Sequence, residues 1–427
     1  MDAQFFIERL NHPEKEERLK ALAELKKMID AGLLPLPKAG KDVNNHIHTA
    51  YSFSPYSPAK AVWMAYNAGL VTAGIMDHDS ISGAEEFIEA GKIIGMATTI
   101  GVECRADMSD TKLNGKRINN PDQKSVAYMA LHGIAHTKIN EVKEFFKPYS
   151  AARNLRNRDM VAKINELVAS AGLHLDFDAD VAPISNCSEG GSITERHILF
   201  ALAKKITARF GKGAKVAQFL NDSMNITLNE KAKGFLNDES NPYYEYDLLG
   251  ILKSDMVEKF YIPATAECPK VKDVTQLGKK VGAISAYAYL GDVGNSVTGD
   301  KKAQSFEDGY IDLLFEEIKS LGFNAVTYMP TRNTLEQLLK LKKLIKDYDL
   351  FEISGEDINS PRQVFICKAL EKPEFANLID STWALIGHEH MSTEDINKSM
   401  FAEETIAKYP SLEERVNAYK KIGLSLK

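Results

Sequence analysis

Apolar and polar positions follow a helical period at the start of the chain. In residues 1–40 the apolar side chains recur three or four positions apart, which predicts a helical segment that packs on the outside of the rest of the protein. The positions with this spacing are Leu19, Leu22, Leu25, Met28 and Ile29. Gly32 follows them as a candidate C-cap, because glycine readily adopts the left-handed conformation that ends many helices.

From residue 42 onward, short apolar runs alternate with helical patterns. This alternation continues to about residue 137 and resumes near residue 276. Strands that alternate with helices in this way predict parallel βαβ units. When the two stretches are joined, seven strand patterns stand in βα order. Residues 41–137 and 276–369 are therefore predicted to form a seven-stranded (β/α)7 TIM-like barrel.

The stretch between the two halves of the predicted barrel has a different pattern. Residues 138–275 are mostly helical segments separated by polar and glycine-rich connectors. They are interpreted as an inserted, mainly helical domain. Residues 370–427 also carry helical patterns and are predicted to form a C-terminal helical segment.

Composition narrows the class of protein. Of the 427 residues, 44% are hydrophobic and 26% are charged, which is ordinary for a globular protein. No apolar run approaches the ~20 residues that span a bilayer, and the N-terminus lacks the apolar core of a signal peptide. Four scattered cysteines without a CxxC pair fit a reducing compartment, so a cytoplasmic location without a membrane partner is expected. The net charge of −6 argues against extended nucleic-acid binding but leaves a small phosphate pocket and the oligomeric state open.

Histidines and carboxylates gather where the predicted strands end. In a β/α barrel the functional side chains lie at the C-terminal ends of the strands. His46 and His48 stand two positions apart on the first strand, so both imidazoles can face one ion. The other candidates are His78, Glu103, His132 and Asp357. Imidazole and carboxylate are the usual ligands of Zn, Mn or Fe in hydrolytic sites.

Each motif also has a structural explanation when it is taken alone. A single HxH pair is more often a surface or core feature than a metal site. The Asp77-His78-Asp79 sequence is typical of a helix N-cap and turn, because aspartate is favoured there. Glu103 could be a buried structural carboxylate, although burial without a cation is costly. The coincidence of these motifs at successive strand ends favours a metal site.

The ordered motifs resemble those of the PHP (polymerase and histidinol phosphatase) family of phosphoesterases. The segments that carry the resemblance are HIHTAYSFSPYSP, GIMDHDSISG, IGVEC, MALHGI and ISGEDINSP. They cover roughly residues 42–137 and 278–365. The resemblance implies a distorted seven-stranded barrel with up to three bound metals, and the strand pattern agrees with that fold.

The resemblance also implies a complete ligand set for one metal ion. In the family this ion is held by the HxH pair, the glutamate of the GVE motif and the aspartate of the last strand. In this sequence the corresponding residues are His46, His48, Glu103 and Asp357.

The ligand sets of the other two ions are incomplete. A second ion would share the glutamate and use His132, but Tyr287 stands where a fifth-strand histidine is expected. A third would use His78, with Phe53 and Asn359 in its two remaining ligand positions. Tyrosine and asparagine bind these metals poorly compared with imidazole. One or two divalent ions, Zn, Mn or Fe, are therefore expected.

The predicted insertion carries a second resemblance. ELVASAGLHLDFDADV followed by SITERHILFALAKKI is similar to the helical insertion of a PHP branch that acts on nucleoside 3′,5′-bisphosphates and short oligoribonucleotide ends. The resemblance implies that Arg196 and His197 grip a substrate phosphate near a helix N-terminus, which favours anions. Alternatively, Arg196 caps a neighbouring turn and His197 fills a helix interface. Arg153, Arg156 and Arg158 are weaker candidates, because arginine runs are usually solvated faces.

Two further motifs have open roles. Arg362 follows the last metal motif and could face a substrate anion or simply begin a helix. His388 and His390 could lie in a surface turn or replace a missing metal ligand at the barrel mouth.

Together these residues predict metal-dependent hydrolysis of a phosphate ester of a small metabolite, such as a nucleotide, by metal-activated water. Arg196 and Arg362 would offset charge on the phosphoryl oxygens. His78 would serve as the general acid if the third metal is absent. The alternatives are metal-assisted hydrolysis of a non-phosphate substrate and a non-catalytic protein that binds a metal or ligand.

Overall fold

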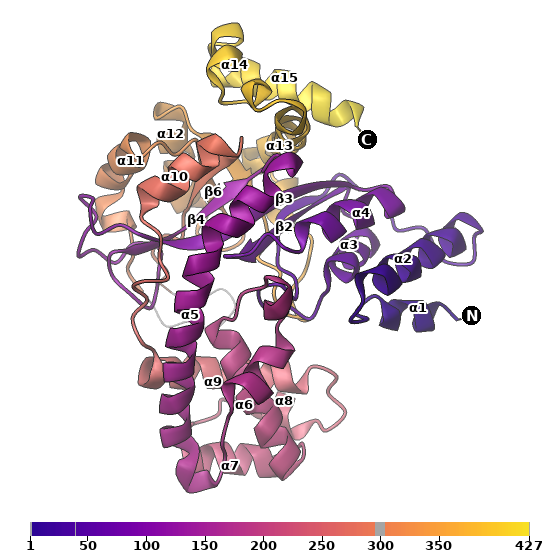
Figure 1. Cartoon of the computed structure of the whole chain (residues 1–427), viewed down its shortest axis with the longest axis vertical. Coiled ribbons are helices and arrows are strands. Elements are labelled where there is room, and N and C mark those ends of the chain that lie inside the picture. The colour runs from indigo at the N-terminus through magenta and orange to yellow at the C-terminus, as the bar shows by residue number, and fades with distance from the viewer. Residues whose placement is uncertain (1, 39, 295–303, 427) are drawn as a thin grey trace.

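One curled sheet organises the protein (Figure 1). The computed structural model describes residues 2–38, 40–294 and 304–426. Within these residues, seven strands form a single sheet in the order β1-β2-β3-β4-β5-β6-β7. The strands are β1 (Val43–Ile47), β2 (Thr72–His78), β3 (Ala97–Asp107), β4 (Val126–His132), β5 (Ile284–Ala288), β6 (Ala325–Tyr328) and β7 (Phe351–Ser354). The two edges approach each other through an isolated parallel bridge between Ile47 and Ile358.

The sheet is mixed, which corrects the prediction of a barrel built only from parallel βαβ units. The strands β1 to β3 are parallel to one another, as are β5 to β7. The strand β4 pairs antiparallel with both β3 and β5. The chain passes from β3 to β4 through residues 108–125, which form turns and contain no helix. A parallel neighbour usually needs a crossover helix, and without one the chain turns back beside β3.

Helices pack on the outside of the curled sheet (Figure 1). They are α3 (Pro58–Asn67), α4 (Ala84–Ile94), α10 (Val271–Lys280), α11 (Ile311–Ser320) and α12 (Leu335–Asp347). Their starts follow ordinary capping chemistry. The Ser57 side chain caps α3 by accepting a hydrogen bond from the Lys60 amide, and Pro58 occupies the first turn. The fold class is therefore α/β.

The first forty residues form two helices, α1 (Ala3–Arg9) and α2 (Lys15–Asp30), which lie beside α3 and α4 (Figure 1). The apolar face of α2 is buried, as its spacing predicts. Its core side chains are Leu19, Leu22, Leu25 and Ile29, while Met28 is half-buried. Arg18 and Glu86 join α2 to α4 by a buried ion pair of 2.5 Å.

A long helix, α5 (Ile139–Val168), connects the sheet to a separate helical layer (Figure 1). The helices of that layer are α6 (Glu195–Phe210), α7 (Ala214–Met224), α8 (Glu230–Asn237) and α9 (Tyr244–Phe260). They share a hydrophobic core distinct from the one under the sheet, built on residues such as Leu202, Leu248 and Phe260. The helix α10 already packs against β5. The limits of an inserted domain at 138–275 stay a prediction.

The C-terminal residues form α13 (Asn377–Glu394), α14 (Glu403–Lys408) and α15 (Leu412–Ser425), at the end of the molecule away from the helical layer (Figure 1). The helices α13 and α15 are in backbone contact. A Cβ added to Gly387 would lie 2.1 Å from the Tyr419 carbonyl oxygen, and one added to Gly423 would lie 2.0 Å from that of Trp383. Only glycine permits so close an approach. Among the described helices, none has the length and apolar character needed to cross a membrane.

Candidate functional site

Five polar side chains converge at the C-terminal ends of the parallel strands. We call them the histidine–carboxylate cluster: His46, His48, His78, Glu103 and Asp357. The Nε2 atoms of His46 and His48 lie 3.2 Å apart. Oε2 of Glu103 is 3.5 Å from His46 Nε2 and 3.2 Å from His78 Nδ1. On the other side, Oδ1 of Asp357 is 3.2 Å from His48 Nε2.

The register of the strands explains this convergence. His78 stands opposite Glu103 in the β2–β3 ladder. His46 and His48 flank the fully buried Ile47, and residues two apart on an extended chain face the same side. After β7, the Ile358 amide donates to the His46 carbonyl oxygen and the His48 amide donates to the Ile358 carbonyl oxygen, at 3.1 and 2.9 Å. These bonds hold the segment that carries Asp357 beside β1.

The two carboxylates of the cluster are held in the ionised state. Burial alone would raise the pKa of Glu103, but His78, His46 and His48 hold it at about 2. At Asp357 the effect of burial is likewise overcome, chiefly by the hydrogen bond and charge of His48, and its pKa lies well below the usual range. Ionised carboxylates facing imidazole nitrogens are the donor set that a divalent cation requires.

A metal ion fits this donor set. Among the described residues, His46, His48 and Glu103 offer ligand atoms that all lie within 4.8 Å of one another. Nitrogen and carboxylate oxygen suit Zn, Mn and Fe alike, so the donors leave the choice among these metals open. The ligand roles of these residues and of Asp357 stay predictions, and the geometry is consistent with them.

His132 lies deeper in the sheet than the sequence suggested. Because β4 is antiparallel, its C-terminal end points away from the cluster, and His132 stands opposite Gly101. Burial, together with the charge of His46, lowers the pKa of His132 to about 3 and keeps the ring neutral. Its Nε2 is buried and has no hydrogen-bond partner among the described residues. An unpaired, neutral nitrogen near Glu103 is compatible with the predicted ligand role.

The His78 side chain is in contact with other residues of the cluster. Its Nδ1 faces Glu103 at 3.2 Å, and its ring lies 4.7 Å from that of His48. Burial lowers the pKa of His78 to about 3, so the imidazole is neutral near pH 7. Neutral imidazole is the form that binds metals. The arrangement therefore favours the ligand role over the general-acid role, and both stay predictions.

Tyr287 and Phe53 stand where metal-binding residues were expected, and both side chains contact other residues instead. The Tyr287 hydroxyl donates to Glu307 Oε1 at 3.3 Å, in a fully buried pair. Phe53 packs edge-to-face on His197 with 5.0 Å between ring centroids, and it belongs to the core of the helical layer. Phe53 therefore holds the loop after β1 against the helical layer.

The helical layer reaches the cluster through one arginine. Arg196 lies in the first turn of α6 and donates a hydrogen bond to Asn359 Oδ1. The Asn359 side-chain amide in turn donates to Asp357 Oδ1 at 2.5 Å. Asn359 thus bridges a carboxylate of the cluster to a cation from the helical layer.

The neighbouring His197 is placed differently. Its Nδ1 accepts a hydrogen bond from the Thr194 amide at 3.0 Å as part of the α6 capping box. The ring is buried, and burial lowers its pKa to about 3. This environment favours the alternative in which His197 fills a helix interface.

The remaining candidate residues lie in other contacts. Arg362 pairs with Asp247 of α9 through two bonds of 2.6 and 2.8 Å. On α13, His388 is buried and its Nδ1 accepts from the Met400 amide, while His390 faces Glu394 at 3.4 Å. His388 packs against Gly133, next to His132. The possibility that His388 or His390 supplies a missing ligand stays a prediction.

Ser52 and Asp77 lie behind the cluster, and neither was predicted from the sequence to contact a metal ligand. The Ser52 hydroxyl lies 3.1 Å from His48 Nδ1 and donates to Asp77 Oδ1 at 2.6 Å. Asp77 also accepts from the amide and hydroxyl of Thr49. Such contacts fix the orientation of a metal-binding imidazole. Their sequence signal was the first aspartate of the Asp-His-Asp motif.

The PHP domain model matches residues 44–237. This match covers β2, β3 and β4 and ends with α8, so part of the chain is similar to the PHP domain. His46, His48, His78 and Glu103 fall inside the match and Asp357 lies beyond it. The sequence matches no curated protein.

Comparison with solved structures finds two that are similar to this chain. A protein of Bifidobacterium adolescentis ATCC 15703 described as a "putative metal-dependent phosphoesterase" has a TM-score of 0.50 at 19% identity, over 79% of this chain and 96% of that chain. An amidohydrolase from Chromobacterium violaceum has a TM-score of 0.49 at 15% identity, over 76% of this chain and 89% of that chain. The first likeness supports the fold. The similarity to the PHP domain and the group formed by His46, His48 and Glu103 are consistent with a metal-dependent hydrolase.

Proposed function

We propose that this chain is a PHP-type hydrolase that cleaves a phosphate ester of a small metabolite, with a nucleotide as the leading substrate class. The observation that carries the proposal is the contact from Arg196 through Asn359 to Asp357. It sets a permanent cation beside a donor set suited to a divalent metal. Arginine binds phosphate oxygens with a rigid fork of donors, which suits a substrate whose reacting group is anionic.

Each residue of the site has a distinct task in this proposal. A divalent ion held by His46, His48, Glu103 and Asp357 would lower the pKa of a water and polarise a phosphoryl oxygen. Arg196 binds a non-bridging oxygen and offsets the charge that grows there during reaction. Asn359 orients the guanidinium by accepting from it. The preference for nucleoside bisphosphates that the helical segment implies is part of this proposal.

The test combines metal analysis with a phosphate-release screen. The purified protein, loaded in turn with Zn²⁺, Mn²⁺ or Fe²⁺, is offered nucleoside monophosphates, nucleoside bisphosphates and sugar phosphates. We expect stoichiometric metal, release of phosphate from a nucleotide, and loss of release after treatment with a chelator. Arg196→Gln should raise KM, with Arg158→Gln as the control, because Arg158 pairs with Asp178 at an exposed site. A protein that binds no metal contradicts the proposal.

A second candidate is metal-assisted hydrolysis of a non-phosphate substrate. One observation favours it: Arg153, Arg156 and Arg362, all candidates for phosphate binding, already pair with carboxylates. In the same screen, stoichiometric metal without phosphate release from any ester, together with turnover of an amide or lactone, would select this candidate.

A further inference from the structure

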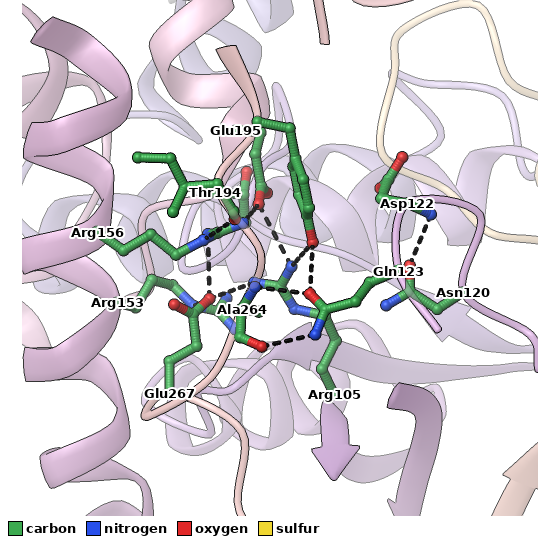
Figure 2. Close-up of polar contacts among 12 residues, drawn as sticks. Arg105, Asn120, Asp122, Gln123, Arg153, Arg156, Thr194, Glu195, Ala264 and Glu267 are labelled. Atoms are coloured by element: carbon green, nitrogen blue, oxygen red, sulfur yellow. Dashed lines mark hydrogen bonds and ion pairs between the residues drawn. The ribbon is translucent and has the colours of Figure 1, made fainter. Parts of the chain in front are cut away.

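Three buried arginines meet two glutamates between the sheet and the helical layer (Figure 2). We call this group the arginine–glutamate network: Arg105, Arg153, Arg156, Glu195 and Glu267. Oε1 of Glu267 lies 2.6 Å from Arg105, 3.1 Å from Arg156 and 3.6 Å from Arg153. Oε1 of Glu195 lies 2.8 Å from Arg156 and 3.3 Å from Arg105. Figure 2 shows these side chains pointing toward one another from different elements.

The charges of the network compensate one another. Arg153 donates its second contact to Asp79 Oδ2 at 2.6 Å, so three carboxylates face the three arginines. The arginines are 4–7% exposed and Glu267 is 2% exposed. Because buried charges are tolerated only when paired, these arginines are committed to the protein and not to a substrate.

Members of the network adjoin the residues of the proposed site in sequence. Arg105 follows Glu103 by two positions on β3, so both side chains face the same side of the sheet. Asp79 follows His78, and its amide donates to the Glu103 carbonyl oxygen at 2.7 Å. Glu195 precedes Arg196 in the first turn of α6. The backbone therefore links the network to Glu103 and His78 on the sheet, and to Arg196 on the helical layer.

The loop that carries Glu267 is itself held in place. The Gln123 side chain bonds both the amide and the carbonyl oxygen of Ala264, at 2.6 and 2.7 Å (Figure 2). Arg156 donates to the Ile262 carbonyl oxygen at 2.6 Å and lies over the Tyr261 ring. With its partners fixed, Glu267 gives Arg105 and Arg156 defined positions from which to hold Glu195.

We propose that Glu195 is a positioning residue: held by Arg156 and Arg105, it fixes the first turn of α6 and thereby aims Arg196 at the histidine–carboxylate cluster. Arg196 reaches the site from the helical layer, so its position depends on how that layer is joined to the sheet. Glu195 is the carboxylate that makes this joint at the same turn. The effect on catalysis rests on the proposed function, whereas the effect on the α6 turn does not.

The kinetic test is a double-mutant cycle on the metal-loaded enzyme with a nucleotide that it hydrolyses. We expect Glu195→Gln to lower kcat/KM by about 10- to 100-fold, mainly through KM, because small misplacements of a binding group have effects of this size. In the Arg196→Gln background the same substitution should cause no further loss, because the two residues act through one contact. Losses that multiply would overturn the proposal.

The matched control is Glu86→Gln, which removes a buried carboxylate from the Arg18 pair far from the network. Its kcat/KM should equal that of the wild type. An equal loss in Glu86→Gln and Glu195→Gln would mean general destabilisation and would overturn the positioning role.

A readout independent of activity is amide hydrogen exchange. Glu195→Gln should speed exchange in residues 192–200 by about tenfold and leave residues 214–224 of α7 unchanged. Unchanged exchange in residues 192–200 overturns the inference. If this exchange is faster but the wild type releases no phosphate from any ester, the proposed function fails and the positioning of the α6 turn stands.

Discussion

Two buried polar groups adjoin on β3, and their charges are satisfied in different ways. In the arginine–glutamate network each guanidinium faces a carboxylate at 2.6–2.8 Å. In the histidine–carboxylate cluster two imidazole nitrogens face each other at 3.2 Å, and Nε2 of His132 is unpaired among the described residues. With Asp79, three carboxylates face the three arginines of the network, so its charges balance. The cluster leaves ligand-type atoms without such partners, and this difference distinguishes a structural joint from a candidate metal site.

The largest expected effect is on the cluster. Glu103→Gln keeps the shape of the side chain but removes the charge that faces His46 and His78. A catalytic metal contributes several kcal/mol, so its loss should lower kcat/KM by about 10⁴-fold. Metal content, measured by elemental analysis, should fall in parallel. If Glu103→Gln retained both metal and activity, the interpretation of the cluster as a metal site would be wrong.

The second-largest expected effect is on the free energy of unfolding, through a substitution in the arginine–glutamate network. Glu267→Gln leaves three buried guanidinium groups with one fewer negative charge and should lower the free energy of unfolding by about 3–5 kcal/mol. Urea denaturation measures it. Glu230→Gln is the control, because Glu230 pairs with Lys233 on an exposed surface and should change stability by less than about 0.5 kcal/mol. Equal midpoints for both variants would contradict the structural role of the network.

A smaller effect is expected behind the cluster. Ser52→Ala removes the contact to His48 Nδ1 and should weaken metal affinity by about 10- to 100-fold. The stability of the metal-free protein should change little. Ser254→Ala, on the exposed side of α9, serves as the control. Wild-type metal affinity in Ser52→Ala would mean that the orientation of His48 does not depend on this hydroxyl.

The smallest effect concerns an ion pair outside both groups. His136 Nε2 lies 2.8 Å from Glu389 Oε1. Burial opposes the charged form of His136, but the hydrogen bond and charge of Glu389 raise its pKa above the usual value. Burial raises the pKa of Glu389. Because the folded state raises the pKa of His136, its contribution to stability is present below about pH 6.5 and declines as pH rises through that raised pKa. Glu389 titrates separately, in the range of a carboxyl group whose pKa is raised.

His136→Gln should therefore lose more stability at low pH than at high pH. The expected difference is below about 1 kcal/mol, because the histidine is 34% exposed and solvent screens the pair. Urea midpoints near pH 6 and pH 8.5 test it, with His390→Gln as the exposed control. A pH-independent difference from the wild type would contradict the linkage.

Short-range pattern was sufficient to predict much of the fold. The spacing of apolar positions predicted the α2 core, and the alternation of strands and helices predicted an α/β fold. The direction of β4 could not be read in this way, because the pattern of a buried strand is the same in either direction. The absence of a helix in residues 108–125 was the available signal.

The convergence of the site residues was also accessible from sequence, since His46, His48 and Asp357 lie at or just after strand ends. Glu103 lies within β3, level with the last residue of β2. The ion-pair partners of the arginines could not be predicted from the sequence. Nothing local to Arg153 or Arg362 indicates that Asp79 or Asp247 will neutralise it, because these pairs form only when the helical layer folds back onto the sheet. Whether an arginine is available to a ligand is a property of tertiary structure.

The way in which α5 leaves the sheet has one more consequence. Near the start of α5, Glu141 pairs with Lys280 at the end of α10, at 3.0 Å, so the chain departs and returns at adjacent points. The segment between those points begins and ends at one place on the sheet, and the arginine–glutamate network and Arg196 contact the sheet side again at the site. The helical layer is thus held at two places: where the chain departs from the sheet and returns to it, and at the network beside the histidine–carboxylate cluster.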